Sequence, residues 1–245
     1  MKGGQGGRMK EEKPLLLFLM SLKPHGMGKR ALQHRETDYS ASLIRLKQLG
    51  ILKSRNVIIC ENTCSSVADY LDSNLGSLAS ELNISISSVN EGSKNKGAGE
   101  LSMALKAYKD FPELFEAADN VEFMSGRHIL TSPGLFHLAS ELKKDALVGN
   151  PDFFFLTGEI HLTEKNGMYN DMFFAMRKGF FLSYLNYFSN NKSEMIEKMI
   201  NSESLLYRFC ELQSLEIEWV EHFGLLRRDS RPFFRFWRRS TWHLC

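Results

Sequence analysis

The stretch Pro14-Leu15-Leu16-Leu17-Phe18-Leu19-Met20 decides the fold. It is a continuous apolar run with charged residues before it and turn residues after it. The run is far shorter than the about 18 apolar residues that cross a bilayer, and no small-residue cleavage pattern follows it. Neither a membrane span nor a secretory signal is therefore expected. The pattern is typical of a strand that helices cover on both faces, which predicts the first strand of an α/β domain.

The same succession of strand, loop and helix recurs downstream. Strands are expected at 14–20, 56–60 and 82–89, followed by helices at 37–49, 65–75 and 97–108. Three such units imply a parallel sheet with right-handed crossovers. Further strands are expected at 121–131 and 152–156, then a long helix at 168–182 and more helices within 193–222. The predicted fold class is α/β, with a mostly parallel sheet flanked by helices and a helical C-terminal annex.

The composition is that of a folded protein. The chain has 245 residues, a net charge of +2, and 43% hydrophobic and 24% charged residues. A chain of this length is expected to form one domain around a single hydrophobic core. Its four cysteines are too few for a disulfide scaffold and lack the spacing of a zinc site, so a reducing cytoplasm is expected. The expected organisation is a disordered leader at 1–13, an α/β domain at 14–190, a helical annex at 191–230 and a basic aromatic tail at 231–245.

Polar residues follow each of the first three predicted strands, where ligands bind in open parallel sheets. They are Lys23, His25, Gly26, Gly28 and Lys29 after the first strand, Glu61 and Asn62 after the second, and Lys94, Asn95 and Lys96 after the third. Helix N-termini flanked by Lys and Gly suit a phosphate. The first loop has neither a P-loop nor a dinucleotide fingerprint, so an ordinary Pro/Gly turn stays open there.

Three short motifs extend this pattern. They are Glu61-Asn62, then Asn95-Lys96-Gly97-Ala98-Gly99-Glu100, and finally Ser125-Gly126-Arg127-His128. Together with Asn170-Asp171-Met172-Phe173-Phe174, they resemble bacterial sugar transferases of O-antigen and capsule clusters, which are related to the GT-A nucleotide-sugar fold. The resemblance covers roughly 14–187. It departs from the family pattern at Met124, where a basic residue is usual, and at His128, where Tyr is usual.

The resemblance implies a nucleotide-sugar site. Its residues would be Glu61 and Asn62 near the nucleotide, with Lys96, Gly97, Ser125, Gly126, Arg127 and His128 toward the diphosphate. GT-A enzymes commonly hold a divalent metal through an Asp-x-Asp at the strand that here ends in Ser125, and this chain has no Asp-x-Asp. No cofactor is therefore expected, although a divalent metal stays open as the alternative, and the fork of Arg127, with His128, would neutralise the diphosphate instead. A structural ion pair is the alternative role of Arg127.

A carboxylate is needed to remove the proton of the acceptor hydroxyl in an inverting transfer. The candidates are Asp171, at the start of the predicted long helix, and Glu159, after the strand at 152–156. Asp171 is equally explained as a helix cap, and Glu159 as one edge of an outer strand. Glu159, His161 and Glu164 would also suit a metal, although strand alternation explains them without one.

The tail interleaves arginine with aromatic residues. Of the last twenty residues, six are arginine and one is acidic. This composition is typical of an interfacial anchor, carried by Arg235, Phe236, Trp237, Arg238 and Arg239. Single-stranded nucleic acid would bind a similar segment, although no specific nucleic acid is expected, and aromatic packing on the body of the protein is the third alternative.

These patterns predict a glycosyltransferase that acts in surface polysaccharide assembly, and more closely a hexosyltransferase. Its partners would be a nucleotide-sugar donor, a lipid-linked saccharide acceptor and the cytoplasmic membrane surface, with peripheral attachment at the inner face. The competing hypothesis is a non-catalytic module that docks on membrane or RNA through the tail.

Overall fold

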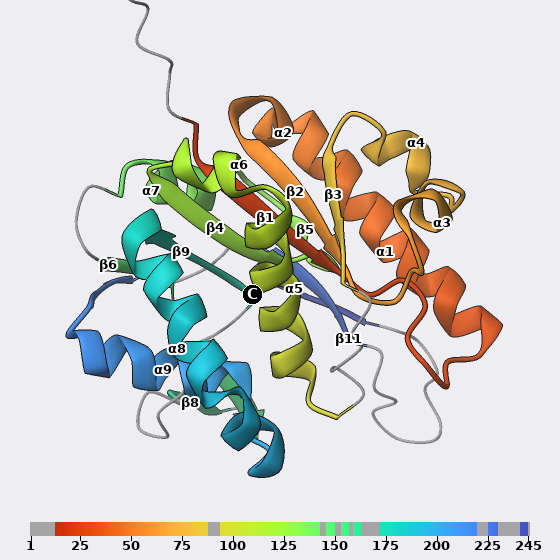
Figure 1. The fold of residues 1–245 in the computed structure, drawn as a ribbon. Helices are drawn as coiled ribbons and strands as arrows, with labels where there is room; N and C mark the ends of the chain where they lie inside the picture. Colours follow the sequence, from red (N-terminus) through yellow and green to blue (C-terminus); the bar gives the residue numbers. More distant parts are fainter. Residues whose placement is uncertain are drawn as a thin grey trace, which may run out of the picture.

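The chain folds around one seven-stranded sheet (Figure 1). A computed structural model describes residues 13–87, 94–142, 146–149, 153–156, 159–162, 172–219, 225–229 and 241–244, and the side chains within 13–87, 94–142 and 172–216 and of Leu225. In spatial order the strands are β10 (Glu216–Trp219), β6 (Ala146–Gly149), β9 (Phe173–Arg177), β4 (Asn120–Ser125), β1 (Leu15–Met20), β2 (Asn56–Glu61) and β3 (Asn83–Ile86). All neighbouring pairs are parallel except those that β9 makes with β4 and β6.

Strand β1 is an interior strand of this sheet, between β4 and β2, and all six of its side chains are buried. Leu15, Leu17 and Leu19 belong to the apolar cluster on one face, and the alternate residues belong to the cluster on the other. The register pairs Met20 with Glu61 of β2, and Leu19 with Ser125 of β4. The carboxyl ends of these three strands therefore meet at one edge of the sheet.

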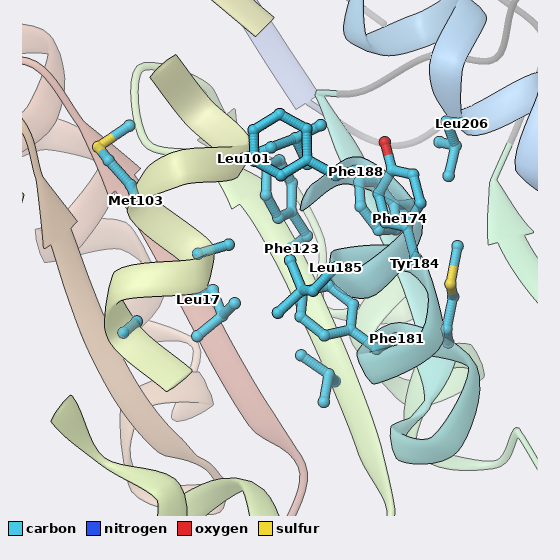
Figure 2. Close-up of a cluster of buried hydrophobic side chains, with 14 of the residues drawn as sticks. Leu17, Leu101, Met103, Phe123, Phe174, Phe181, Tyr184, Leu185, Phe188 and Leu206 are labelled. Atoms are coloured by element: carbon cyan, nitrogen blue, oxygen red, sulfur yellow. The ribbon is translucent and has the colours of Figure 1, made fainter. Parts of the chain in front are cut away.

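Helices cover both faces. One face packs against α5 (Lys96–Asp110), α6 (Pro112–Glu116), α8 (Lys178–Glu197) and α9 (Ser202–Gln213). The other packs against α1 (Lys29–Gln48), α2 (Ile51–Ser54), α3 (Val67–Leu71), α4 (Gly76–Ala79) and α7 (Gly134–Ser140). Figure 2 shows the first cluster, in which the rings of Phe123 and Phe174 stack with centroids 4.6 Å apart. The sheet thus lies between two helical layers.

Two small sheets complete the described residues. One has the order β12 (Thr241–Leu244), β11 (Leu225–Asp229) and β5 (Ile129–Leu130), and the other pairs β7 (Phe153–Leu156) with β8 (Glu159–Leu162). Within the described ranges, none of the helices has the length and apolar character needed to cross a membrane.

The predicted α/β fold class is confirmed, whereas the predicted helix at 168–182 is wrong. Strand β9 occupies 173–177, and α8 begins only at Lys178. The apolar spacing fits a helix, but Phe173, Phe174, Ala175 and Met176 are all buried because β9 pairs on both sides and is covered on both faces. The helices expected up to 222 end at Gln213, since 216–219 is a strand of the main sheet.

The strand expected at 121–131 is interrupted. Strand β4 ends at Ser125, a turn follows, and β5 is a separate strand of another sheet. The break places the Ser125-Gly126-Arg127-His128 motif at the carboxyl edge of the main sheet, beside the ends of β1 and β2.

Candidate functional site

A cavity of about 170 Å³ opens at this carboxyl edge. Its walls come from the ends of β1 and β4, the loops after β1 and β2, the middle of α1 and the first turns of α5. The polar residues that line it are Ser21, Arg35, Tyr39, Asn62, Thr63, Lys96, Glu100, Ser125 and Arg127. The prediction that strand-tip residues converge is thus met for Asn62, Lys96, Ser125 and Arg127.

Glu61 holds the loops beside the cavity and does not line it. Its carboxylate is fully buried and accepts hydrogen bonds from the backbone N–H groups of Leu22 (3.1 Å) and Thr63 (2.6 Å), and from the Thr63 hydroxyl. Burial raises the pKa of Glu61, and these hydrogen bonds act in the opposite direction. The side chain therefore fixes the loops after β1 and β2 against each other.

Ser21 joins three elements at the floor of the cavity. Its hydroxyl donates to Oδ1 of Asn62 (2.7 Å), and its backbone N–H donates to the Tyr39 hydroxyl (2.9 Å). Its carbonyl oxygen accepts from Nη1 of Arg35 (2.8 Å). Helix α1 is therefore tied to the end of β1 by two side chains one helical turn apart.

Arg35 and Arg127 bring two positive charges to the cavity. Burial lowers the pKa of Arg35, the Tyr39 hydroxyl opposes that shift, and the nearby charge of Arg127 adds to it. The Nε atom of Arg35 is buried without a hydrogen-bond partner. Within the part of the chain that the structure describes, the guanidinium of Arg127 makes no hydrogen bond or ion pair. Two positive charges thus lie close together, and both guanidinium groups have N–H groups that no described residue accepts from.

Lys96 and Glu100 form the wall that α5 contributes. Their side chains pair at 2.9 Å across one helical turn, and the side chain of Lys96 remains 64% exposed. Asn95 caps this helix by accepting from the N–H of Ala98 (3.1 Å), while its amide donates to the carbonyl of Ile200 (2.8 Å). The start of α5 is thereby held against the connection between α8 and α9.

Gly97 and Gly126 are required for close packing. A Cβ at Gly97 would come within 2.6 Å of the backbone nitrogen of Ser202. A Cβ at Gly126 would lie 2.7 Å from both the Leu19 carbonyl oxygen and the ring of Phe18. The N–H of Gly126 donates to that same carbonyl (2.8 Å), so the residue holds the turn after β4 against β1.

His128 closes the turn after β4. It is buried, its Nδ1 lies 3.1 Å from the carbonyl oxygen of Ser125, and its own carbonyl accepts from the Ser42 hydroxyl (2.7 Å). His128 does not line the cavity, so this geometry makes it a support for Ser125 and Arg127.

Other predicted site residues lie elsewhere. Glu159 begins β8, whose side chains are not among those described, while Asp171 and the tail residues Arg235, Phe236, Trp237, Arg238 and Arg239 lie outside the described residues. Four residues that line the cavity are not among the predicted site residues, namely Arg35, Tyr39, Ser21 and Glu100. The only signal was the spacing of Arg35 and Tyr39, which puts both on one face of a helix.

Comparison with known proteins bears on the fold. No family model and no curated protein matches the chain. It is similar to the solved structure of a putative nucleotide-diphospho-sugar transferase from Desulfovibrio desulfuricans, with a TM-score of 0.51, 14% identity, and coverage of 83% of this chain and 78% of the other. The chain has a GT-A-like fold. It is also similar to the structure of galactosyltransferase LgtC in complex with donor and acceptor sugar analogues. The TM-score is 0.51 and the identity 11%, and the match covers 83% of this chain and 72% of LgtC.

The described residues do not fit the divalent metal that is common in GT-A enzymes. Nowhere in the described ranges do three His, Cys, Asp or Glu side chains gather in a way that would hold a metal ion. Among the described residues, one carboxylate lines the cavity, that of Glu100, and it is paired with Lys96. Two guanidinium groups beside it favour an anion and repel a cation.

Proposed function

We propose that the protein is a glycosyltransferase that transfers a sugar from a nucleotide-sugar donor to an acceptor. The sugar would be a hexose. The observation that carries this proposal is the pair of guanidinium groups, Arg35 and Arg127, which line one cavity and form no ion pair with the described residues. The cavity lies at the carboxyl edge of an open α/β sheet, which is where such folds bind ligands. A diphosphate would give both groups the charge-assisted hydrogen bonds that they lack.

The donor would be held by residues of several elements. Asn62 lies at the end of β2 and would contact the nucleotide, while Lys96, Ser125 and Arg127 lie on the cavity wall and would contact the diphosphate. Glu61, Gly97, Gly126 and His128 would support these contacts through the loops and helices that they fix. This division refines the set of eight residues that the sequence motifs mark.

The transfer would form a bond between the acceptor hydroxyl oxygen and the anomeric carbon, and it would break the bond from that carbon to the diphosphate. In an inverting reaction a carboxylate takes the hydroxyl proton, and Asp171 or Glu159 would have this role. The negative charge that develops on the leaving diphosphate would be stabilised by Arg127 and Arg35, which are in place before the reaction.

The acceptor would be a lipid-linked saccharide in O-antigen or capsule assembly. This part of the proposal is supported by the sequence motifs around Lys96 and Ser125 and by the arginine and aromatic composition of 231–245. Arg235, Phe236, Trp237, Arg238 and Arg239 would attach the protein to the inner face of the cytoplasmic membrane. Sedimentation with vesicles tests this attachment, since replacing all three of these arginines by Gln should abolish binding to anionic vesicles and leave nucleotide binding unchanged.

Thermal unfolding in the presence of nucleotides tests the donor site. A transferase of this kind should be stabilised by UDP, GDP or CMP compounds, because a ligand that binds only the folded state raises the melting temperature. Sugar transfer from the stabilising nucleotide sugar, with Asp171→Asn sparing binding and removing turnover, would complete the assignment. A chain that responds to none of these compounds would instead be the non-catalytic docking module.

A further inference from the structure

The charges that line the cavity do not cancel. Among the residues that the structure describes, four charged side chains line it, namely Arg35, Lys96, Glu100 and Arg127. Lys96 and Glu100 neutralise each other through their 2.9 Å ion pair. The nearby carboxylate of Glu61 is turned to the loop backbone and does not line the cavity. The described part of the lining therefore carries two guanidinium charges that no described ion pair neutralises.

Two guanidinium groups match one particular kind of anion. The diphosphate of a nucleoside diphosphate sugar carries two negative charges near neutral pH, whereas the phosphodiester of a nucleoside monophosphate sugar carries one. Each guanidinium presents a planar fork of donors that fits phosphate oxygens, and neither fork is filled by the described residues. A divalent cation on the same diphosphate would neutralise it and leave both guanidinium groups unpaired in a partly buried cavity.

We propose that Arg35 and Arg127 together bind the diphosphate of the donor directly and in place of a divalent cation. The site then selects nucleoside diphosphate sugars over nucleoside monophosphate sugars, and its affinity is independent of added metal. This inference rests on the proposed function, because it names the donor class of the same cavity. Arg35 is the new element of the site, since it lies on α1, far in sequence from the motifs that mark the other residues.

Calorimetric titration of the full chain with UDP, GDP, UMP and GMP, first in EDTA and then with Mg²⁺ or Mn²⁺, tests the inference. One of the two diphosphates should bind in EDTA, at least about tenfold more tightly than its monophosphate, because a second charge-assisted contact is gained. Added metal should leave that dissociation constant unchanged within about twofold.

Single variants then assign the contacts. Arg35→Gln and Arg127→Gln should each weaken diphosphate binding by about tenfold or more, and each should bring the diphosphate and monophosphate affinities together. Arg45→Gln is the matched control, because Arg45 lies on the same helix and also donates to backbone carbonyls, those of Leu130 (3.0 Å) and Thr131 (2.9 Å), away from the cavity. It should lower the melting temperature and leave nucleotide affinity unchanged.

The outcomes separate the two proposals. Binding of nucleoside diphosphates only after a divalent metal is added would overturn this inference and leave the proposed function standing. An equal loss of diphosphate and monophosphate affinity in folded Arg35→Gln would likewise overturn the role of Arg35. If none of these four nucleotides binds with or without metal, this inference fails, and the proposed function fails with it only if CMP compounds do not bind either.

Discussion

Arginine side chains lie at both ends of the central strands, and they differ in whether their N–H groups have hydrogen-bond partners. At the amino end, Arg55 donates to both carboxylate oxygens of Glu122 (2.6 and 2.9 Å) and to the Phe136 carbonyl (2.6 Å), and its guanidinium stacks 4.7 Å from the ring centroid of Phe136. At the carboxyl end, the charges of Arg35 and Arg127 lie near each other, and the two guanidinium groups have N–H groups without a partner among the described residues.

On the proposed function, the difference separates an arginine that stabilises the fold from a pair that would bind the ligand. The side chains of Arg55 and Glu122 are 5% and 0% exposed, and such a buried pair is tolerated because each charge satisfies the other. The like charges of Arg35 and Arg127 repel each other, and on the proposed function a bound diphosphate would remove this repulsion. Stability should therefore depend mainly on the amino end, and nucleotide affinity on the carboxyl end.

Glu122→Ala should have the largest effect on stability. The variant leaves the guanidinium of Arg55 buried without its counter-charge, which typically costs about 3–5 kcal/mol of unfolding free energy. Urea denaturation measures the loss. The double variant Arg55→Met with Glu122→Met should recover most of it, because no uncompensated charge remains. A loss below about 1 kcal/mol in Glu122→Ala would remove the distinction between the two ends.

The strand and the cavity residues that the sequence predicts correctly are marked by local sequence patterns. Strand β1 was predictable because seven consecutive apolar residues stand between charges and turns, and the residues after β1, β2 and β4 were marked by the rule that ligands bind at strand ends. Asn62, Lys96, Ser125 and Arg127 do line one cavity. Their convergence needed only the parallel order of the strands, which the chain pattern already implies.

The failures follow from contacts that no local pattern encodes. Strand β9 is buried on both faces, so its Phe173 and Phe174 lack the alternation that marks a strand and fit a helical spacing instead. Arg35 lies in the polar first half of α1, and only the packing of that helix against the end of β1 turns it toward the cavity. A partner distant in sequence decides the role of each of these residues.

Gly126→Ala should affect both stability and binding. The new Cβ would lie 2.7 Å from the Leu19 carbonyl oxygen and from the Phe18 ring, so the turn that carries Arg127 must shift. Overpacking of this kind costs about 1–3 kcal/mol, measured by urea denaturation.

Gly179→Ala is the control for this variant, because nothing lies within 4 Å of its new Cβ and α8 should be stabilised slightly. Nucleotide affinity should fall in Gly126→Ala and remain unchanged in Gly179→Ala. Unchanged affinity in both would show that the position of Arg127 does not matter for binding.

Arg127→Ala should leave stability almost unchanged while it weakens nucleoside diphosphate binding by about tenfold or more. In the absence of ligand the substitution relieves the repulsion on Arg35 and breaks no hydrogen bond within the described residues, so unfolding free energy should stay within about 0.5 kcal/mol of the parent or rise. Denaturation without and with UDP or GDP measures both effects. Destabilisation comparable to that of Glu122→Ala would instead make Arg127 a structural residue.

Asp69→Asn should have the smallest effect, because its partner is an exposed lysine. Nζ of Lys23 lies 2.6 Å from the Asp69 carboxylate, and this hydrogen bond, with one from the N–H of Ser65, lowers the pKa of Asp69 to about 2. A carboxylate with a depressed pKa in the folded state contributes stability that is complete above its ordinary pKa of 3.8 and is lost as the pH falls toward about 2. Near pH 7 the variant should therefore be slightly less stable than the parent. Denaturation at a series of pH values should show the two curves converging below pH 3.8, and a constant difference across that range would mean that Lys23 and Asp69 do not interact through charge.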